Sequence, residues 1–304
     1  PAINNTSFTP FSPVSSRNIE NFYLSNKYFS QYRPTLVAKP NFSAAGDAAA
    51  LRNAMRGIGT DEDAIIEVLC KRPVSQRLEI LRTYKTNYGK DLVNDIKSET
   101  TGDFEDLLVG LLQPTIEFYT AELHSALSGK GTNEAALLDI MPVLSNREMK
   151  QVSALYKEKF GKTLEEKLQS DLSGGFRKLM VALSNGNRDE SMMTNVQLAR
   201  SDANVIKSVV VAGDTEEISV NQILCQRNFD QIKVITQEYK KLTGHDIEDD
   251  IKEKFSGNLQ SGLKSILRYA NNRSAFFASR LHKAIEGVGT NTKSLSRIVI
   301  TRSE

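Results

Sequence analysis

One short pattern recurs along the chain, and its spacing constrains the fold more than any other feature. Residues 57–60 place two glycines around one residue just before a threonine, and the arrangement returns at Gly129 and Gly287. Gly129 lies 72 residues after Gly57, and Gly287 lies 158 residues after Gly129, close to two further periods. A degenerate copy with one glycine, residues 211–216, falls near the missing third place. This periodicity predicts four units of about seventy residues.

The first two loops are each followed by an acidic residue at the same distance. Glu99 lies 44 residues after Met55, and Asp171 lies 44 residues after Leu127. Glycine tolerates positive φ, so such a loop can form a tight arc in which carbonyl oxygens converge. Calcium takes about six to eight oxygen ligands, including backbone carbonyls and bidentate carboxylates. The predicted Ca²⁺ ligands are Met55, Gly57, Gly59 and Glu99 in the first unit and Leu127, Gly129, Gly131 and Asp171 in the second, with Thr60 and Glu62 as weaker candidates.

The doubled glycine, the threonine and the acid at a fixed offset resemble the repeats of the annexin family, from about Pro34 to the end of the sequence. The resemblance implies an all-α fold of four repeats of about seventy residues, with five helices each, arranged in a curved disc. It also implies calcium held between loop and acid on a convex, membrane-facing surface. With the fourth repeat incomplete, the predicted segments are a flexible leader (1–33), repeat 1 (34–112), repeat 2 (113–184), a linker and repeat 3 (185–270) and a truncated repeat 4 (271–304).

The third and fourth units depart from this pattern in different ways. The third keeps an acid, Glu253, but its loop lacks the double glycine, and the β-branched Val211 resists positive φ. We therefore expect a weak or absent third site. The fourth has a complete loop, but an acid at the same offset would fall beyond Glu304, so this unit is either truncated or damaged. Its weaker candidate ligands are Ile285, Gly287 and Gly289.

Composition narrows the class of protein. A chain of 304 residues with 39% hydrophobic and 25% charged residues is typical of a globular protein with a substantial core. No apolar run approaches the roughly 18 residues of a spanning helix, and residues 1–18 lack the pattern of a signal peptide. The net charge of +2 gives no indication of a nucleic-acid partner. We expect a cytoplasmic protein, peripheral on membranes when calcium rises, with export without a signal peptide left open.

The two cysteines occupy equivalent positions in different units. Cys70 and Cys225 each lie ten residues after a threonine, Thr60 and Thr215. Equivalent positions in separate units should be far apart, so we expect free, buried thiols instead of a disulfide.

Helical periodicity begins at about Asp47, and no strand is predicted. Thr60 followed by Asp63 predicts a capping box at a helix start. Pro142 lies inside the expected second helix of the second unit and should bend or end it. Polar residues 184–201 predict a longer linker between the two halves of the chain.

The leader contains one segment with helical periodicity. Ile19, Phe22 and Tyr23 would share one face of a short helix over residues 17–29. Two interpretations stay open: a tail packed on the core, or a helix that binds a protein partner.

Each candidate site residue also has a simpler interpretation. A Gly-x-Gly loop can be only a tight turn, and Glu99 and Asp171 could be helix N-caps. Arg56 could meet a lipid phosphate or be solvated. The residues between the glycines should be exposed, either dipping among lipids or as ordinary surface residues; these candidate membrane contacts are Ile58, Lys130 and Val288.

The resemblance further suggests a central polar channel lined by Glu122, Asp139 and Arg297, although Leu144 replaces an arginine expected there. A buried ion network that orders the two halves is the alternative to a conducting pore.

The predicted function is a calcium bridge to anionic phospholipid membranes. One carboxylate with neutral carbonyls leaves bound calcium positively charged, with open positions for a lipid phosphate. Affinity in solution should be weak, on the order of 10⁻⁴ to 10⁻³ M, and several sites would act together. The rivals are a calcium-independent helical-repeat scaffold that binds proteins and an enzyme that uses Gly-x-Gly loops to hold phosphates. No nucleophile–base pair or histidine with ligand spacing supports catalysis, so we predict that the protein is not an enzyme.

Overall fold

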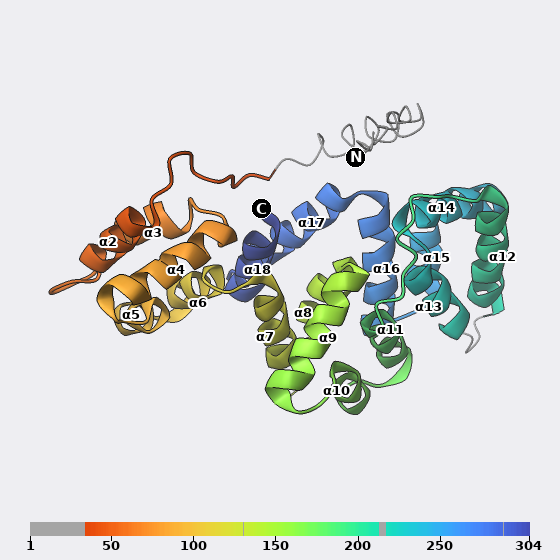
Figure 1. The fold of residues 1–304 in the computed structure, drawn as a ribbon. Coiled ribbons are helices and arrows are strands. Elements are labelled where there is room, and N and C mark those ends of the chain that lie inside the picture. The colour runs from red at the N-terminus through yellow and green to blue at the C-terminus, as the bar shows by residue number, and fades with distance from the viewer. Residues whose placement is uncertain (1–33, 130, 213–216, 288) are drawn as a thin grey trace, which may run out of the picture.

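The computed structural model describes residues 34–129, 131–212, 217–287 and 289–304, and every regular element in these ranges is a helix (Figure 1). Apart from an isolated bridge between Gly129 and Gly131, the described ranges contain no β structure. The all-α fold predicted from the sequence is therefore confirmed. The predicted leader, including its candidate helix over residues 17–29, lies outside the described residues.

The helices follow a repeating order of five. The first unit contains α2 (Ala44–Ala54), α3 (Glu62–Leu69), α4 (Val74–Tyr88), α5 (Leu92–Glu99) and α6 (Gly102–Leu111). The second contains α7 (Thr115–Leu127), α8 (Glu134–Ile140), the short 3₁₀ helix η1 (Met141–Val143), α9 (Asn146–Phe160), α10 (Leu164–Asp171) and α11 (Gly174–Ser184). The third contains α12 (Val196–Ala212), α13 (Glu217–Gln226), α14 (Phe229–Thr243), α15 (Ile247–Lys254) and α16 (Gly257–Asn271), and the fourth begins with α17 (Arg273–Ile285) and α18 (Thr292–Arg302).

The helices that follow the first, second and fourth loops each begin at a short polar side chain. The Asp61 carboxylate accepts a hydrogen bond from the backbone N–H of Ala64, which satisfies a free donor at the start of α3. The capping box predicted for Thr60 and Asp63 is wrong, because Asp61 is the cap and the Thr60 hydroxyl instead donates to Glu99. Asn133 and Asn291 cap α8 and α18 in the same way.

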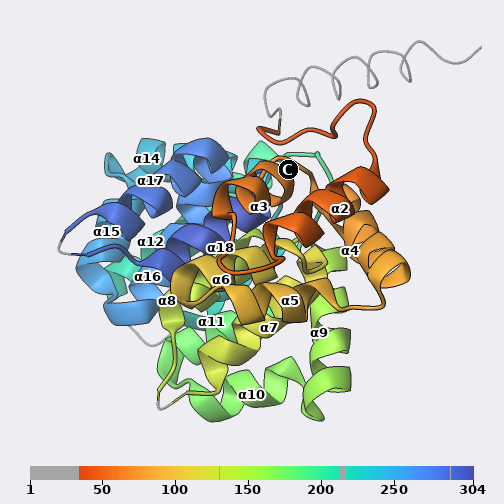
Figure 2. The same cartoon turned by 90° about the vertical axis from the view of Figure 1, so that its left-hand side faces the viewer.

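Buried apolar side chains form two main clusters. One belongs to the first unit and includes Leu51, Ile80 and Ile96. The other is continuous across the second and third units, from Tyr119 to Ala270. Helices α17 and α18 lie between these bodies, where α18 packs on α6 and α8 and α17 packs on α16 (Figures 1 and 2). The incomplete fourth unit therefore joins the first unit to the rest of the molecule.

The first and third units each contain an ion pair between corresponding residues, buried in the first unit and partly buried in the third. Arg72 contacts Asp47 at 2.7 Å in the first unit, and Arg227 contacts Asp202 at 2.7 Å in the third. The corresponding positions of the second unit hold Leu144 and Tyr119, so both partners of the pair are absent there, the arginine through the Leu144 substitution noted in the sequence.

In the fourth unit the arginine is kept as Arg302, but Phe277 stands in place of its acid. Arg302 lies 4.5 Å above the Phe277 ring and donates to the Tyr119 hydroxyl at 3.1 Å. Arg302 therefore links the fourth unit to the second, whereas the corresponding arginines of the first and third units pair with an acid of their own unit.

Pro142 and the linker behave largely as expected. Helix α8 ends at Ile140 and continues only as the 3₁₀ turn η1, which contains Pro142 at its second residue, so the predicted break is confirmed. The linker spans residues 185–195, shorter than predicted because α12 already begins at Val196. Arg188 anchors it by donating to the carbonyls of Leu224 and Arg227 at 2.7 Å.

Both cysteines are free, as predicted. Cys225 is buried and Cys70 half-buried, and burial raises the pKa of both thiols, that of Cys225 to about 12. Among the described helices, none combines the length and apolar character needed to cross a bilayer.

Candidate metal centres and the central ion network

The first loop is a closed arc between α2 and α3. The backbone N–H of Asp61 donates to the Ala54 carbonyl at 2.9 Å and joins the two ends of the loop. Gly57 has φ of 111° and Gly59 has φ of 87°, values that side-chain-bearing residues rarely adopt. Between them Ile58 is fully exposed at the tip. The sequence predicted this arc from the two glycines, and the backbone has the required conformation.

The second and fourth loops are closed by the equivalent backbone hydrogen bond. Asn133 donates from its backbone N–H to the Ala126 carbonyl at 2.9 Å, and Asn291 donates to the Ala284 carbonyl at 2.7 Å. In the fourth unit Gly287 and Gly289 have φ of 99° and 90°, close to the values in the first loop. In the described part of the second loop, Gly131 has φ of 123°, whereas Gly129 does not have positive φ and forms an isolated bridge with Gly131. The second arc therefore differs from the other two.

Glu99 lies against the first loop. It is the last residue of α5, so the N-cap interpretation is wrong for this residue. The Thr60 hydroxyl donates to its carboxylate at 3.0 Å, and this contact joins the arc to the acid across 39 residues of chain. The arrangement offers neutral carbonyl oxygens and one carboxylate, which suits a hard cation such as Ca²⁺.

Asp171 ends α10 as Glu99 ends α5, so it is not an N-cap either. Its carboxylate is already engaged by Lys167 at 2.8 Å and by the Ser170 hydroxyl at 2.7 Å. Burial pushes the pKa of Asp171 upward, but these hydrogen bonds outweigh it and hold the pKa below its usual range. No hydrogen bond joins Asp171 to the described residues of the second loop, so a cation bound there would compete with Lys167 for the carboxylate.

In the third unit the end of α15 shows that the prediction of Glu253 as the equivalent acid is wrong. Helices α5 and α10 end three residues before Gly102 and Gly174, and α15 ends at Lys254, three residues before Gly257. Lys254, not Glu253, therefore occupies the position of Glu99 and Asp171. Counting back from the glycine would have shown this in the sequence. The Glu253 carboxylate is 69% exposed and pairs with Lys254 at 2.8 Å.

The third loop is also shorter than the first. Helix α12 continues through Val211 to Ala212, and α13 begins at Glu217. Residues 213–216 lie outside the described chain. Val211 was expected to resist positive φ, and its backbone is helical. The prediction of a weak or absent third site stays a prediction.

The remaining candidate loop residues differ in exposure, and two of them lie outside the described residues. Arg56 and Glu62 are exposed, and Ile285 is 56% exposed beside the fourth loop. Met55 and Leu127 have buried side chains, so only their backbone carbonyls could serve as ligands. Lys130 and Val288 are outside the described residues. Within the described ranges no group of three or more His, Cys, Asp or Glu side chains could hold a metal, so a cation would depend on backbone oxygens.

The polar residues predicted at the centre form one ion network. Arg297 contacts Asp139 at 2.9 Å and Glu122 at 2.7 Å, bringing together α7, α8 and α18. The sequence analysis missed Arg280 on α17, which contacts Asp139 at 3.3 Å. Arg280 lies seven residues before Gly287, as Glu122 lies seven before Gly129, so the repeat spacing could have identified it.

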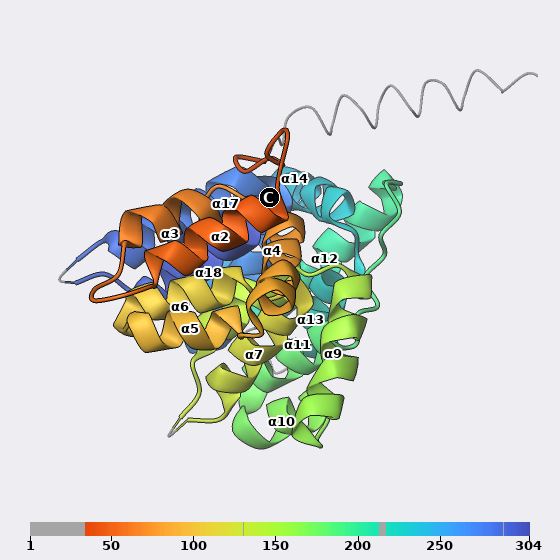
Figure 3. The same cartoon turned by 60° about the vertical axis from the view of Figure 1, so that its left-hand side comes forward.

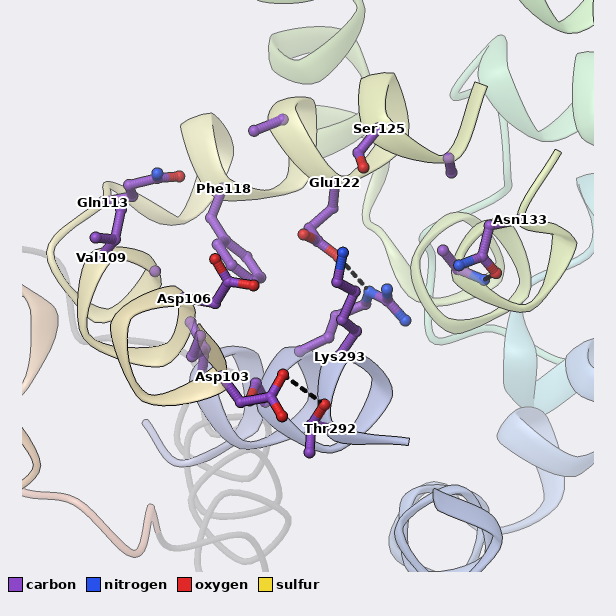
Figure 4. A pocket seen from close by; sticks show the side chains of 17 residues that line it. Asp103, Asp106, Val109, Gln113, Phe118, Glu122, Ser125, Asn133, Thr292 and Lys293 are labelled. Atoms are coloured by element: carbon purple, nitrogen blue, oxygen red, sulfur yellow. Dashed lines mark hydrogen bonds and ion pairs between the residues drawn. The ribbon is translucent and has the colours of Figure 1, made fainter. Parts of the chain in front are cut away.

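A polar cavity of about 290 Å³ lies beside this network. Figure 4 shows Glu122 pointing into it from α7, together with Asp103 and Asp106 from α6 and Lys293 from α18. The Thr292 hydroxyl donates to Asp103 at 2.8 Å across the cavity edge, joining the first and fourth units.

The fold and these sites define a helical-repeat protein with cation-suited loops between paired helices. The annexin family model matches residues 46–111, 118–183 and 201–266. The chain therefore belongs to the annexin family.

Individual relatives and structures agree with the family model. The chain is 42% identical to human annexin A11 over 276 residues, covering 90% of the chain and 54% of the relative, and 39% identical to bovine annexin A4 over 274 residues, covering 89% and 85%. It spans about half the length of human annexins A11 and A7. Among solved structures, annexin III superposes with a TM-score of 0.86 at 39% identity, covering 90% of this chain and 85% of that one. Calcium-bound annexin (Sm)1 superposes with a TM-score of 0.80 at 32% identity, covering 90% and 82%.

Proposed function

We propose that this chain binds Ca²⁺ at its first and second loops and thereby attaches to anionic phospholipid membranes as a peripheral protein. The observation that carries the proposal is the contact between Thr60 and Glu99, which brings the glycine arc and its acid to one place. The similarity to a calcium-bound annexin structure supports the choice of cation.

The first site would use the carbonyl oxygens of Met55, Gly57 and Gly59 with the Glu99 carboxylate. Bound calcium would supply positive charge and open coordination positions for a lipid phosphate. The single carboxylate keeps the intrinsic affinity weak, and lipid binding would strengthen it by reciprocal linkage. Arg56, exposed beside the loop, is placed to meet a neighbouring phosphate.

Simultaneous contact of several loops with a flat surface would strengthen the attachment. In Figure 3 the connections between α2 and α3 and between α17 and α18 project toward the left-hand side of the molecule, and the connection that follows α7 extends toward the lower left. Several weak sites on one side gain affinity through effective concentration. Ile58 at the tip of the first loop would enter the lipid headgroup region.

We further propose a cytoplasmic location with calcium-driven membrane attachment, a binding function without catalysis, and a role as membrane scaffold or organiser. A protein partner for the leader stays a proposal.

The decisive experiment is vesicle co-sedimentation of Glu99→Gln/Asp171→Asn. This double variant removes the charged ligand of each site, so we expect it to lose most calcium-dependent binding to phosphatidylserine vesicles while its helix content is unchanged. Glu253→Gln is the matched control, since Lys254 holds the corresponding position, and it should sediment as the parent does.

Sedimentation of the double variant at the parent's calcium concentration would refute the site assignment. If sedimentation of the parent protein does not depend on calcium, the result would instead favour the calcium-independent scaffold.

A further inference from the structure

A second cavity, distinct from the one in Figure 4, lies beside the central network at Arg280. It encloses about 590 Å³ between α8, α16 and α17. The first cavity lies between α18, α6 and α7, which are the corresponding helices of the alternate units. The two cavities are therefore related by the repeat, and their linings can be compared position by position.

The comparison shows an inversion of charge. Counting from the glycines of each unit, Asp103, Asp106 and Glu122 in the first cavity correspond to Asn258, Ser261 and Arg280 in the second. The neutral residues Val109, Gln113 and Ser125 correspond to Lys264, Arg268 and Lys283. Among the described residues that line the second cavity, Glu134 is the one acid.

The four cations differ in how far they are already paired. Arg268 contacts Glu248 at 2.7 Å, and Arg280 contacts Asp139 at 3.3 Å and the Ser265 hydroxyl at 3.1 Å. Lys264 and Lys283 form no ion pair with any residue that the structure describes. Lys264 is half-buried and Lys283 is exposed, so their ammonium groups can turn toward a ligand in the cavity.

We propose that this second cavity binds a small anion carrying more than one phosphate group, without calcium. Arg280 would donate to the ligand from a fixed position, because Asp139 and Ser265 hold its guanidinium. Lys264 from α16 and Lys283 from α17 would then contact the phosphate oxygens. A space of about 590 Å³ exceeds a single phosphate and is of the size of small-ligand pockets. The ligand is either a soluble inositol phosphate or the phosphorylated headgroup of a lipid, since Thr132 and Asn133 place the cavity beside the second loop.

The experiment is titration calorimetry of the full chain with inositol trisphosphate in excess chelator. We expect saturable binding that Lys264→Gln/Lys283→Gln weakens at least about tenfold, and that Glu134→Gln strengthens by removing the one acidic lining residue. Lys293→Gln, in the corresponding first cavity, is the matched control and should change affinity less than about twofold. Circular dichroism melting would confirm that the variants fold.

A parallel arm distinguishes the sources of phosphate. Vesicles containing phosphatidylinositol bisphosphate are sedimented with the protein in chelator, against phosphatidylserine vesicles. Binding to trisphosphate identifies a soluble ligand, and binding to the bisphosphate vesicles alone identifies a headgroup. Absence of both, or equal loss in Lys293→Gln and the double lysine variant, would overturn the proposal. Glu99→Gln/Asp171→Asn should retain trisphosphate binding, so failure here is separable from failure of the calcium sites.

Discussion

At the scale of single residues, the loop glycines are needed for backbone conformation and not for space. A Cβ atom at Gly57 or Gly59 would meet nothing within 4 Å, so no packing argument excludes a side chain there. Both residues instead have a φ that L-residues rarely adopt. Changing either glycine should therefore alter the arc while leaving the core intact.

Gly57→Ala tests this distinction. We expect a loss of roughly 1–3 kcal/mol of unfolding free energy if the strained backbone is kept, and less if the loop relaxes. In either case the calcium concentration for half-maximal vesicle binding should rise severalfold. Gly89→Ala is the control, since Gly89 also has positive φ, 64°, with open space around it, but ends α4 away from the loop. Equal calcium requirements for the two variants would show that the conformation of the arc is irrelevant.

At the scale of elements, helix contacts decide where a glycine is required for packing. Gly262 lies within α16, where helix propensity alone favours alanine by about 1 kcal/mol. A Cβ there would stand 2.5 Å from Leu179 Cδ2 of α11, and Leu179 is completely buried. The packing of α16 on α11 therefore opposes the preference of the isolated helix.

Gly262→Ala should consequently destabilise the protein by about 1–3 kcal/mol through overpacking, measured by chemical denaturation followed by circular dichroism. Ser274→Ala, at an exposed position of α17, should stay within about 0.5 kcal/mol of the parent. A Gly262→Ala protein more stable than the parent would mean that Leu179 moves aside freely.

At the scale of the whole molecule, the central network links units that are far apart in the chain. Asp139 of α8 contacts Arg280 of α17 and Arg297 of α18, and Arg297 also reaches Glu122 of α7. Asp139 and Arg297 are both buried, so each charge depends on its partner. We infer that the network orders the two halves, and conduction of ions is not needed to explain it.

Asp139→Asn leaves two arginines facing a neutral group, and we expect it to lower the free energy of unfolding by about 3–5 kcal/mol. Asp230→Asn removes one partner of the surface pair with Lys233, whose side chain is 42% exposed, and should cost at most about 1 kcal/mol. Denaturation curves of the two variants provide the comparison. Similar losses would show that the central pairs contribute no more than a surface contact.

The sequence by itself determined the repeated units, the helical class and the conformation of the first loop. These follow from local chemistry: glycines that permit positive φ, helical spacing of apolar residues, and an acid at a fixed offset, as Gly57 and Glu99 illustrate. Pro142 likewise acts on its own helix, so the break in α8 could be predicted.

Only the tertiary structure decided which charged side chains of different units contact one another. The sequence showed Asp171 as the counterpart of Glu99, but the structure shows its carboxylate engaged by Lys167, one helical turn earlier. Arg280 and Asp139 meet across 141 residues of chain, and the lysines of the second cavity gather from separate helices. The contacts between units depend on the packing of α8, α16 and α17, because side chains from separate helices meet only through that packing, whereas Lys167 and Asp171 pair within one helix.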